Sequence, residues 1–260
     1  SILGQTYRDF EFLIIDDGST DESAEIINSY DDSRIRLQQH PNRGLAESLH
    51  QGVLDARGDI IVRADADDIS HANRIERQVS YLNRARTVGL VRTLLTIINL
   101  DGTIISQSTG ETSLVTSAPR WWFLWRNIGS HASAAIRKSV LLEHNLNYRR
   151  EMNGVEDYDL WSRLLQHTHM GIIDAVLVQY RAHAKGMMGS SQSTLVLELF
   201  SNVVGNNFSY LGVTLSPQEA AAIAVLSCQT TMDPVAYSYH PLVNRLHIHE
   251  KNATALLTQN

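Results

Sequence analysis

The chain has 260 residues, which is enough for one large domain or for one domain with an appendage. Hydrophobic residues make up 43% and charged residues 19%, so the composition is globular and can fill a packed core. The formal net charge is −6, and without a basic field a nucleic acid polymer is not an expected partner.

Strand and helix patterns alternate through the first part of the chain. Apolar runs of strand length predict neighbouring strands of one mostly parallel sheet at 10–15, 34–39 and 60–64. The spacing of apolar residues predicts helices after Thr20, over 45–56 and over 73–84. Asp101-Gly102 is a hairpin turn signal between strands at 88–100 and 103–107, which adds an antiparallel part to the sheet. The expected fold class is therefore α/β.

The last part of the chain has a different character. Residues 194–208 and 217–227 read as helices without chemical motifs, so we expect a catalytic domain over 1–192 and a helical appendage over 193–260. Cys228 is the single cysteine and cannot form an internal disulfide, which fits a reducing compartment. No apolar run approaches the roughly 20 residues of a membrane span.

Asp65, Asp67 and Asp68 come shortly after the apolar run 60–62. Three carboxylates so close repel one another unless a cation neutralises them, and Mg²⁺ or Mn²⁺ prefers such oxygen ligands together with substrate phosphates. A solvated acidic turn or a helix cap is the alternative. The position after a buried strand favours the metal site, because ligands bind beyond the carboxyl ends of parallel strands.

Asp16 and Asp17 occupy the equivalent place after the strand at 10–15. One of the two carboxylates could accept a hydrogen bond from a nucleobase N–H. The alternative is an Asx turn that begins the following helix, and for Asp16 this alternative is the better interpretation.

Glu156 and Asp157 open a predicted helix. Carboxylates at this position can simply compensate the helix dipole, and the motif alone favours that interpretation. A general base must also be a carboxylate or a histidine, so Asp157 is a second possibility to be tested.

Two further segments carry polar or aromatic groups. Arg181 and His183 follow a predicted strand at 175–178 and suit a diphosphate, although solvated residues at a strand end would look the same. The aromatic segment 120–126 could line an acceptor pocket or lie on a membrane surface, but such clusters are more often part of the core.

In their order and spacing, these segments resemble the family-2 glycosyltransferases of the GT-A fold. The matching segments are Ser1–Asp21, Asn42–Gly52, Ile61–Gln78, His131–Ser139, Glu156–Trp161 and Tyr180–His183. The family's first strand has no counterpart before Ser1, where residues 1–5 read as the end of a helix. We therefore expect the sequence to be truncated at its N-terminus.

The resemblance implies a function and a set of roles. It implies an inverting, metal-dependent transfer of a sugar from a nucleotide-diphosphate donor, usually a UDP-sugar, to the hydroxyl of a glycan or lipid-linked acceptor. Asp157 would be the catalytic base with Glu156 beside it, and Asp67 with Asp65 would hold Mn²⁺ or Mg²⁺. The implied donor contacts are Asp16, Asp17, Asn42, Gly44, Asp65, Arg181 and His183, and the candidate acceptor contacts are His131, Trp161 and Asp68.

The setting implied by the resemblance is bacterial polysaccharide and cell-envelope biosynthesis. The expected location is the cytoplasm, including its boundary with the inner face of the membrane, where the protein would associate peripherally.

Two other functions fit part of the sequence. A nucleotidyltransferase shares the sheet and the metal carboxylates but typically begins with a Gly-rich basic loop, and none is visible here. A sugar-nucleotide-binding domain without turnover would not require both Asp67 and Asp157.

Overall fold

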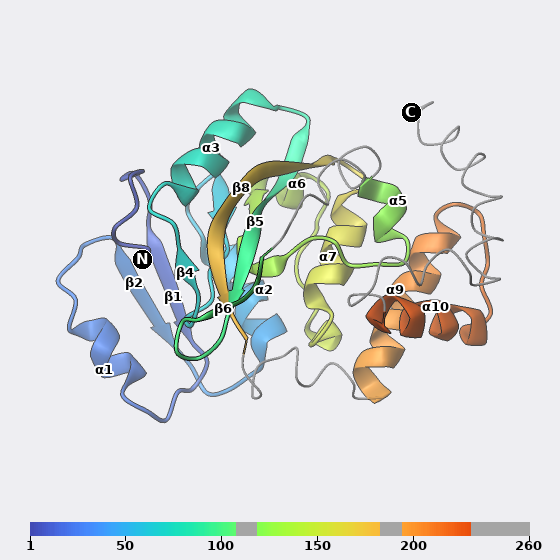
Figure 1. Ribbon diagram of the computed structural model, residues 1–260, viewed down its shortest axis with the longest axis horizontal. Helices are drawn as coiled ribbons and strands as arrows, with labels where there is room; N and C mark the ends of the chain where they lie inside the picture. Colours follow the sequence, from blue (N-terminus) through green and yellow to red (C-terminus); the bar gives the residue numbers. More distant parts are fainter. Residues whose placement is uncertain (108–118, 183–193, 230–260) are drawn as a thin grey trace.

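The computed structural model describes residues 1–107, 119–182 and 194–229. Within these ranges strands and helices alternate, and two sheets lie beside each other with helices packed around them (Figure 1). The α/β class predicted from the sequence is confirmed.

The first sheet contains two parallel strands, β1 (Phe12–Asp16) and β2 (Ile35–Gln39). The short helix α1 (Ser23–Asn28) connects them, and α2 (Leu45–Asp55) follows β2. Gly18 lies in the loop after β1 with φ +82, and a Cβ there would come within 2.7 Å of the Asn42 backbone nitrogen. A glycine is therefore required where the loops that follow β1 and β2 approach each other.

The second sheet has six strands in the order β3-β7-β5-β8-β4, with β6 paired to β5. Its central strands β5 (Val88–Ile98) and β8 (His169–Arg181) run parallel along most of their length. The shorter strands β3 (Ile60–Val62), β4 (Ile69–Ser70), β6 (Ile104–Gln107) and β7 (Ala135–Arg137) all pair antiparallel. The hairpin predicted around Asp101-Gly102 is confirmed by β5 and β6, with Gly102 at φ +91.

The predicted pairing of the strands is correct in one part and wrong in another. β1 and β2 are parallel neighbours as expected, but β3 pairs with β7 in the second sheet. No strand among residues 1–107, 119–182 and 194–229 bridges β1 and β3. The expectation of a single sheet failed because β7, three residues long and without a strong strand pattern, was not foreseen.

Helices pack on the second sheet and form the larger of two cores (Figure 1). α3 (Arg74–Arg84) packs against β5 and β8, and α6 (Lys138–Glu143) directly follows β7. α7 (Glu156–Leu164) is almost entirely buried because it lies between the sheet, α5 (Pro119–Phe123) and α9 (Thr194–Ser209). Burial on this scale holds the start of α7 in a fixed place.

The C-terminal helices predicted from the sequence are present as α9 and α10 (Pro217–Gln229). Side chains of α9 join the core around α7, and Asn207 donates hydrogen bonds to the Phe123 carbonyl and the Ser162 hydroxyl. The predicted boundary at 192 lies outside the described residues and stays a prediction. No helix in the described part of the chain is both long and apolar enough to cross a membrane.

Candidate active site

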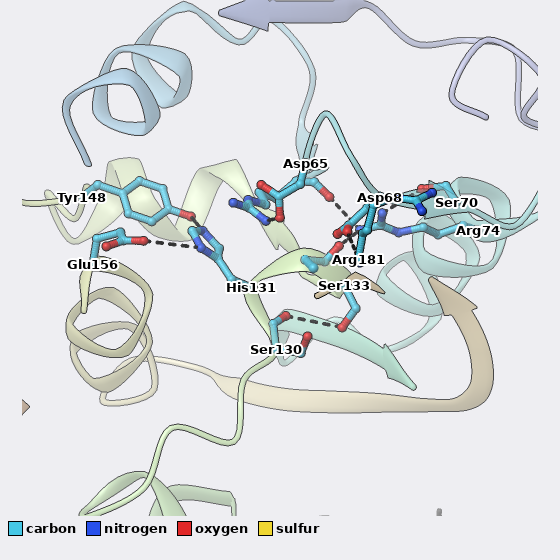
Figure 2. Close-up of polar contacts among 12 residues, drawn as sticks. Asp65, Asp68, Ser70, Arg74, Ser130, His131, Ser133, Tyr148, Glu156 and Arg181 are labelled. Atoms are coloured by element: carbon cyan, nitrogen blue, oxygen red, sulfur yellow. Dashed lines mark hydrogen bonds and ion pairs between the residues drawn. The ribbon is translucent and has the colours of Figure 1, made fainter. Parts of the chain in front are cut away.

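The acidic loop between β3 and β4 is held in place by its neighbours. The Asp68 carboxylate accepts a hydrogen bond from the Arg181 backbone N–H at 2.9 Å, and Asp65 forms an ion pair with Arg63. Figure 2 shows Asp65 and Asp68 on one side of the site, with His131 and Glu156 on the other. Asp67 is exposed in the loop.

Arg181 clamps this loop to the end of β8. Its guanidinium donates hydrogen bonds to the carbonyl oxygens of Asp67, Asn99 and Leu100 at 2.9–3.0 Å. In this arrangement Arg181 shapes the acidic loop, and its predicted contact with a diphosphate stays a prediction. His183, the second predicted diphosphate contact, lies outside the described residues.

The loop has the chemistry for a hard divalent cation. Burial raises the pKa of Asp68, and its Oδ2 is buried without a hydrogen-bond partner, which leaves an oxygen that a cation could satisfy. Across the described residues, no three His, Cys, Asp or Glu side chains converge as a ready-made metal group. With the buried Asp68 Oδ2, the loop fits a cation that takes one or two carboxylates and completes its shell with substrate phosphates.

Asp157 lies in the first turn of α7 and is half-buried. Its Oδ2 accepts a hydrogen bond from Asn127 Nδ2 at 2.8 Å, and its Oδ1 accepts one from the Tyr158 backbone N–H at 2.7 Å. Burial nevertheless raises the pKa of Asp157 above that of an ordinary aspartate. A carboxylate with a raised pKa in a fixed position is suited to accept a proton.

Glu156 is fully buried beside Asp157. Its Oε2 accepts a hydrogen bond from the Gly154 N–H at 2.6 Å, and burial followed by the Asp157 charge raises its pKa to about 7. His131 Nδ1 lies 3.8 Å from Glu156 Oε1, while its Nε2 is 2.9 Å from the Tyr148 hydroxyl. Burial lowers the pKa of His131 well below its usual value, so the histidine is neutral and the contact with Glu156 is not an ion pair.

The raised pKa of Glu156 predicts a pH-dependent stability. Between the unfolded pKa of about 4.5 and the folded pKa of about 7, the folded protein holds a proton that the unfolded chain releases. The free energy of unfolding therefore falls as pH rises through this window. Above about pH 7 the loss of stability caused by ionised Glu156 is complete. Glu156→Gln keeps an acceptor for the Gly154 N–H and cannot ionise. Its free energy of unfolding, relative to that of wild type, should therefore increase by on the order of 1–3 kcal/mol from pH 5 to pH 8.

Urea unfolding of wild type and Glu156→Gln at a series of pH values measures this difference. Glu151→Gln is the matched control, because Glu151 is an exposed glutamate in the short 3-10 helix η2 (Arg150–Met152) before α7. A difference between wild type and Glu156→Gln that stays constant across the pH range would contradict the raised pKa.

The predicted base-binding residues take part in loop structure. Asp16 accepts a hydrogen bond from the Ser19 N–H at 2.8 Å and one from Gln39, which is the Asx turn favoured by the sequence. The Asp17 carboxylate accepts hydrogen bonds from the backbone N–H groups of Arg43 and Gly44 at 2.8 and 2.9 Å. Asp17 thus joins the loop after β1 to the start of α2, and a base contact by Asp16, Asp17, Asn42 or Gly44 stays a prediction.

Trp161 does not fit the acceptor contact implied by the resemblance. It is fully buried, and its indole N–H donates a hydrogen bond to the Gly129 carbonyl at 3.0 Å. An acceptor needs an accessible surface, so this prediction is corrected to a role in the core. In the aromatic segment, Phe123 and Leu124 are also buried and the tryptophans pack against the same core, which confirms the core interpretation of that segment.

The structure brings the acidic loop and the start of α7 toward each other through His131, which the sequence singled out, and through Arg63, which it did not. Arg63 pairs with Asp65, and its N–H donates a hydrogen bond to the carbonyl of Ala134, three residues after His131. The sequence offered a signal for Arg63, because a cation stands two residues before Asp65 at the end of a buried strand. Asn127 had no such signal. Whether Asp17 faces the same cleft as Asp65 stays a prediction.

A separate cavity of about 680 Å³ lies between α7 and α9. Polar side chains line it, among them Arg149, Arg163 and Asn206. None of the predicted site residues lines this cavity, so its position does not bear on the chemistry of the acidic loop.

Known proteins resemble this chain in sequence. The family model described as Glycosyl transferase family 2 matches residues 1–144. An uncharacterized glycosyltransferase of Methanocaldococcus jannaschii is 30% identical over 186 residues, covering 70% of this chain and 63% of the relative. The O-antigen biosynthesis glycosyltransferase WbnJ of Escherichia coli is 30% identical over 199 residues, covering 74% of this chain and 75% of WbnJ. The matches to the first curated relatives span about three fifths of those proteins' lengths.

Solved structures share the fold. S. aureus TarS 1-349 in complex with UDP-GlcNAc has a TM-score of 0.62 at 14% identity, with 92% of this chain and 70% of that chain covered. The mannosyltransferase PcManGT from Pyrobaculum calidifontis, in complex with GDP-Man and Mn²⁺, has a TM-score of 0.59 at 17% identity, with 98% of this chain and 74% of that chain covered. These structures confirm the GT-A fold expected from the sequence. The family model covers more than half of the residues, and the chain belongs to glycosyl transferase family 2.

Proposed function

We propose that this glycosyltransferase moves a sugar from a nucleotide-diphosphate donor to an acceptor hydroxyl, with inversion and with the help of a divalent cation. The observation that carries the proposal is that two acidic groups, the loop after β3 and the start of α7, approach each other across the His131 segment: the Arg63 N–H donates to the Ala134 carbonyl, and the His131 ring lies 3.8 Å from Glu156. A donor diphosphate with its cation requires the first group, and a reacting hydroxyl requires the second.

Asp157 is the proposed base. As the acceptor oxygen attacks the anomeric carbon, its proton passes to the Asp157 carboxylate and the bond from that carbon to the diphosphate oxygen breaks. A single displacement of this kind inverts the anomeric centre. The raised pKa of Asp157 favours the proton transfer, and the hydrogen bonds from Asn127 and Tyr158 orient the carboxylate.

Asp67 and Asp65 are the proposed cation ligands, with the buried Oδ2 of Asp68 next to them. A bound Mn²⁺ or Mg²⁺ supplies Lewis-acid stabilisation of the departing diphosphate. Arg181 keeps the loop in place through the Asp67 carbonyl. The Mn²⁺ in the PcManGT complex supports this choice of cation.

The donor is proposed to be a UDP-sugar and the acceptor a glycan or a lipid-linked glycan. UDP-GlcNAc in the TarS structure supports the UDP-sugar donor, and the O-antigen role in the name of WbnJ supports the glycan acceptor. GDP-Man in the PcManGT structure favours the alternative of a GDP-sugar donor. A role in bacterial cell-envelope polysaccharide synthesis, in the cytoplasm at the inner face of the membrane, follows as part of the same proposal.

Thermal stabilisation by a panel of nucleotide-sugars, each with and without Mn²⁺, tests the proposal on the full-length protein. We expect one donor class to raise the melting temperature by several degrees only with Mn²⁺, because a ligand at 100 times its Kd stabilises by about 2.7 kcal/mol. Stabilisation by nucleoside triphosphates alone would instead favour a nucleotidyltransferase. Donor binding without transfer to any acceptor would favour a binding domain.

A further inference from the structure

Arg63 is a largely buried cation beside the acidic loop of the candidate site. It directly follows β3, and its side chain is only 10% exposed. Its guanidinium forms an ion pair with Asp65, one of the two proposed cation ligands. Its backbone is fixed as well, since its carbonyl accepts a hydrogen bond from the buried Arg74 at 2.7 Å and its N–H donates one to the Ala134 carbonyl at 3.1 Å.

These contacts fix the backbone of Arg63 next to the acidic loop. Arg74 is almost fully buried and also donates hydrogen bonds to the Ala132 carbonyl and the Ser70 hydroxyl. Arg74 therefore ties the end of β3 to β4 and to the segment before β7. The guanidinium of Arg63, paired with Asp65, lies where a cation bound by Asp65 would experience its charge.

We propose that Arg63 is a positioning residue that competes with the divalent cation for Asp65, so that the cation binds tightly only together with the nucleotide. The inference rests on the proposed function, because it concerns the same cation ligands. Without nucleotide, Arg63 neutralises Asp65 and repels a second cation. The donor diphosphate adds negative charge and oxygen ligands, which shift the balance toward the divalent cation.

The arrangement of the loop agrees with this competition. Asp65 is engaged by Arg63, the Asp67 carbonyl is held by Arg181, and no three acidic or histidine side chains of the described chain form a metal group. Coupling between two ligands is reciprocal. If the nucleotide increases the affinity for the cation, the cation increases the affinity for the nucleotide by the same factor. Arg63 would thereby increase the coupling between the two ligands.

Mn²⁺ affinity without nucleotide, measured by electron paramagnetic resonance of free Mn²⁺, tests the proposal directly. Arg63→Gln should bind Mn²⁺ about tenfold more tightly than wild type or better, the usual effect of removing one neighbouring like charge. The ratio of Mn²⁺ affinities with and without UDP should fall in the same variant. Arg84→Gln, at an exposed arginine of α3, is the matched control and should stay within about twofold of wild type.

An Arg63→Gln variant with unchanged or weaker Mn²⁺ affinity would overturn the proposal. If that variant does not fold, Arg63→Met decides, because methionine keeps an apolar stem and removes the charge. Arg63→Met should bind Mn²⁺ about tenfold more tightly than wild type, and equal or weaker binding overturns the proposal. Failure of wild type to bind UDP with Mn²⁺ would count against the proposed function, while the nucleotide-free comparison would still report on Arg63.

Discussion

Asp157→Asn is expected to lower the rate of sugar transfer by about 10²–10⁴-fold, the usual contribution of a general base. The acceptor hydroxyl is a weak nucleophile, and asparagine cannot take its proton. Donor affinity should stay close to that of wild type, because Asp157 contacts the acceptor rather than the diphosphate in the proposed mechanism. Transfer rate and donor affinity are measured on the same preparations.

The surroundings of Asp157 make this substitution informative. Asparagine has nearly the same size, and its oxygen can still accept one of the hydrogen bonds that Asn127 and Tyr158 donate. The fold of α7 should therefore persist. The raised pKa also predicts that the acidic limb of the wild-type pH profile lies above the pKa of an ordinary aspartate, because the base is inactive while protonated.

Glu156→Gln serves as the neighbouring control and should reduce transfer less. Glu156 is fully buried, and its Oε2 accepts a hydrogen bond from Gly154, a contact that glutamine can keep. Equal transfer by Asp157→Asn and wild type would remove Asp157 as the base. Loss of donor binding in Asp157→Asn would assign the start of α7 to the donor site or to the fold.

Local patterns predicted the individual elements of the fold better than their pairing. The apolar runs located β1, β2 and β3, and Asp101-Gly102 located the β5–β6 hairpin, because each signal is contained within a few residues. The partner of β3 depends on β7, whose three residues carry too little pattern to be recognised alone. Contacts between distant segments are not encoded in any single window of the sequence.

The candidate site shows the same division. The acidic loop and the start of α7 were visible in the sequence because carboxylates cluster there. The role of Trp161 was mistaken because burial depends on packing by distant segments. Arg63 and Asn127 gain their importance only from neighbours far along the chain, such as Asp157 for Asn127.

Asp67→Ala should abolish Mn²⁺-dependent binding of UDP, with a Kd raised by at least about 100-fold. Two phosphates beside three carboxylates repel one another unless a cation lies between them, and Asp67 is the principal proposed ligand of that cation. Calorimetric titration of UDP in the presence and absence of Mn²⁺ measures the effect.

The substitution is selective because Arg181 holds Asp67 through its backbone carbonyl, which alanine retains. The loop should therefore keep its shape while losing one carboxylate. Asp174→Ala is the matched control, since Asp174 is an exposed aspartate on β8, and it should bind UDP as wild type does. If Asp67→Ala binds UDP with unchanged affinity and still requires Mn²⁺, the cation is held by other residues. If the dependence on Mn²⁺ disappears while UDP still binds, the diphosphate is neutralised by the protein's own cations, and Arg63 would be the first to test.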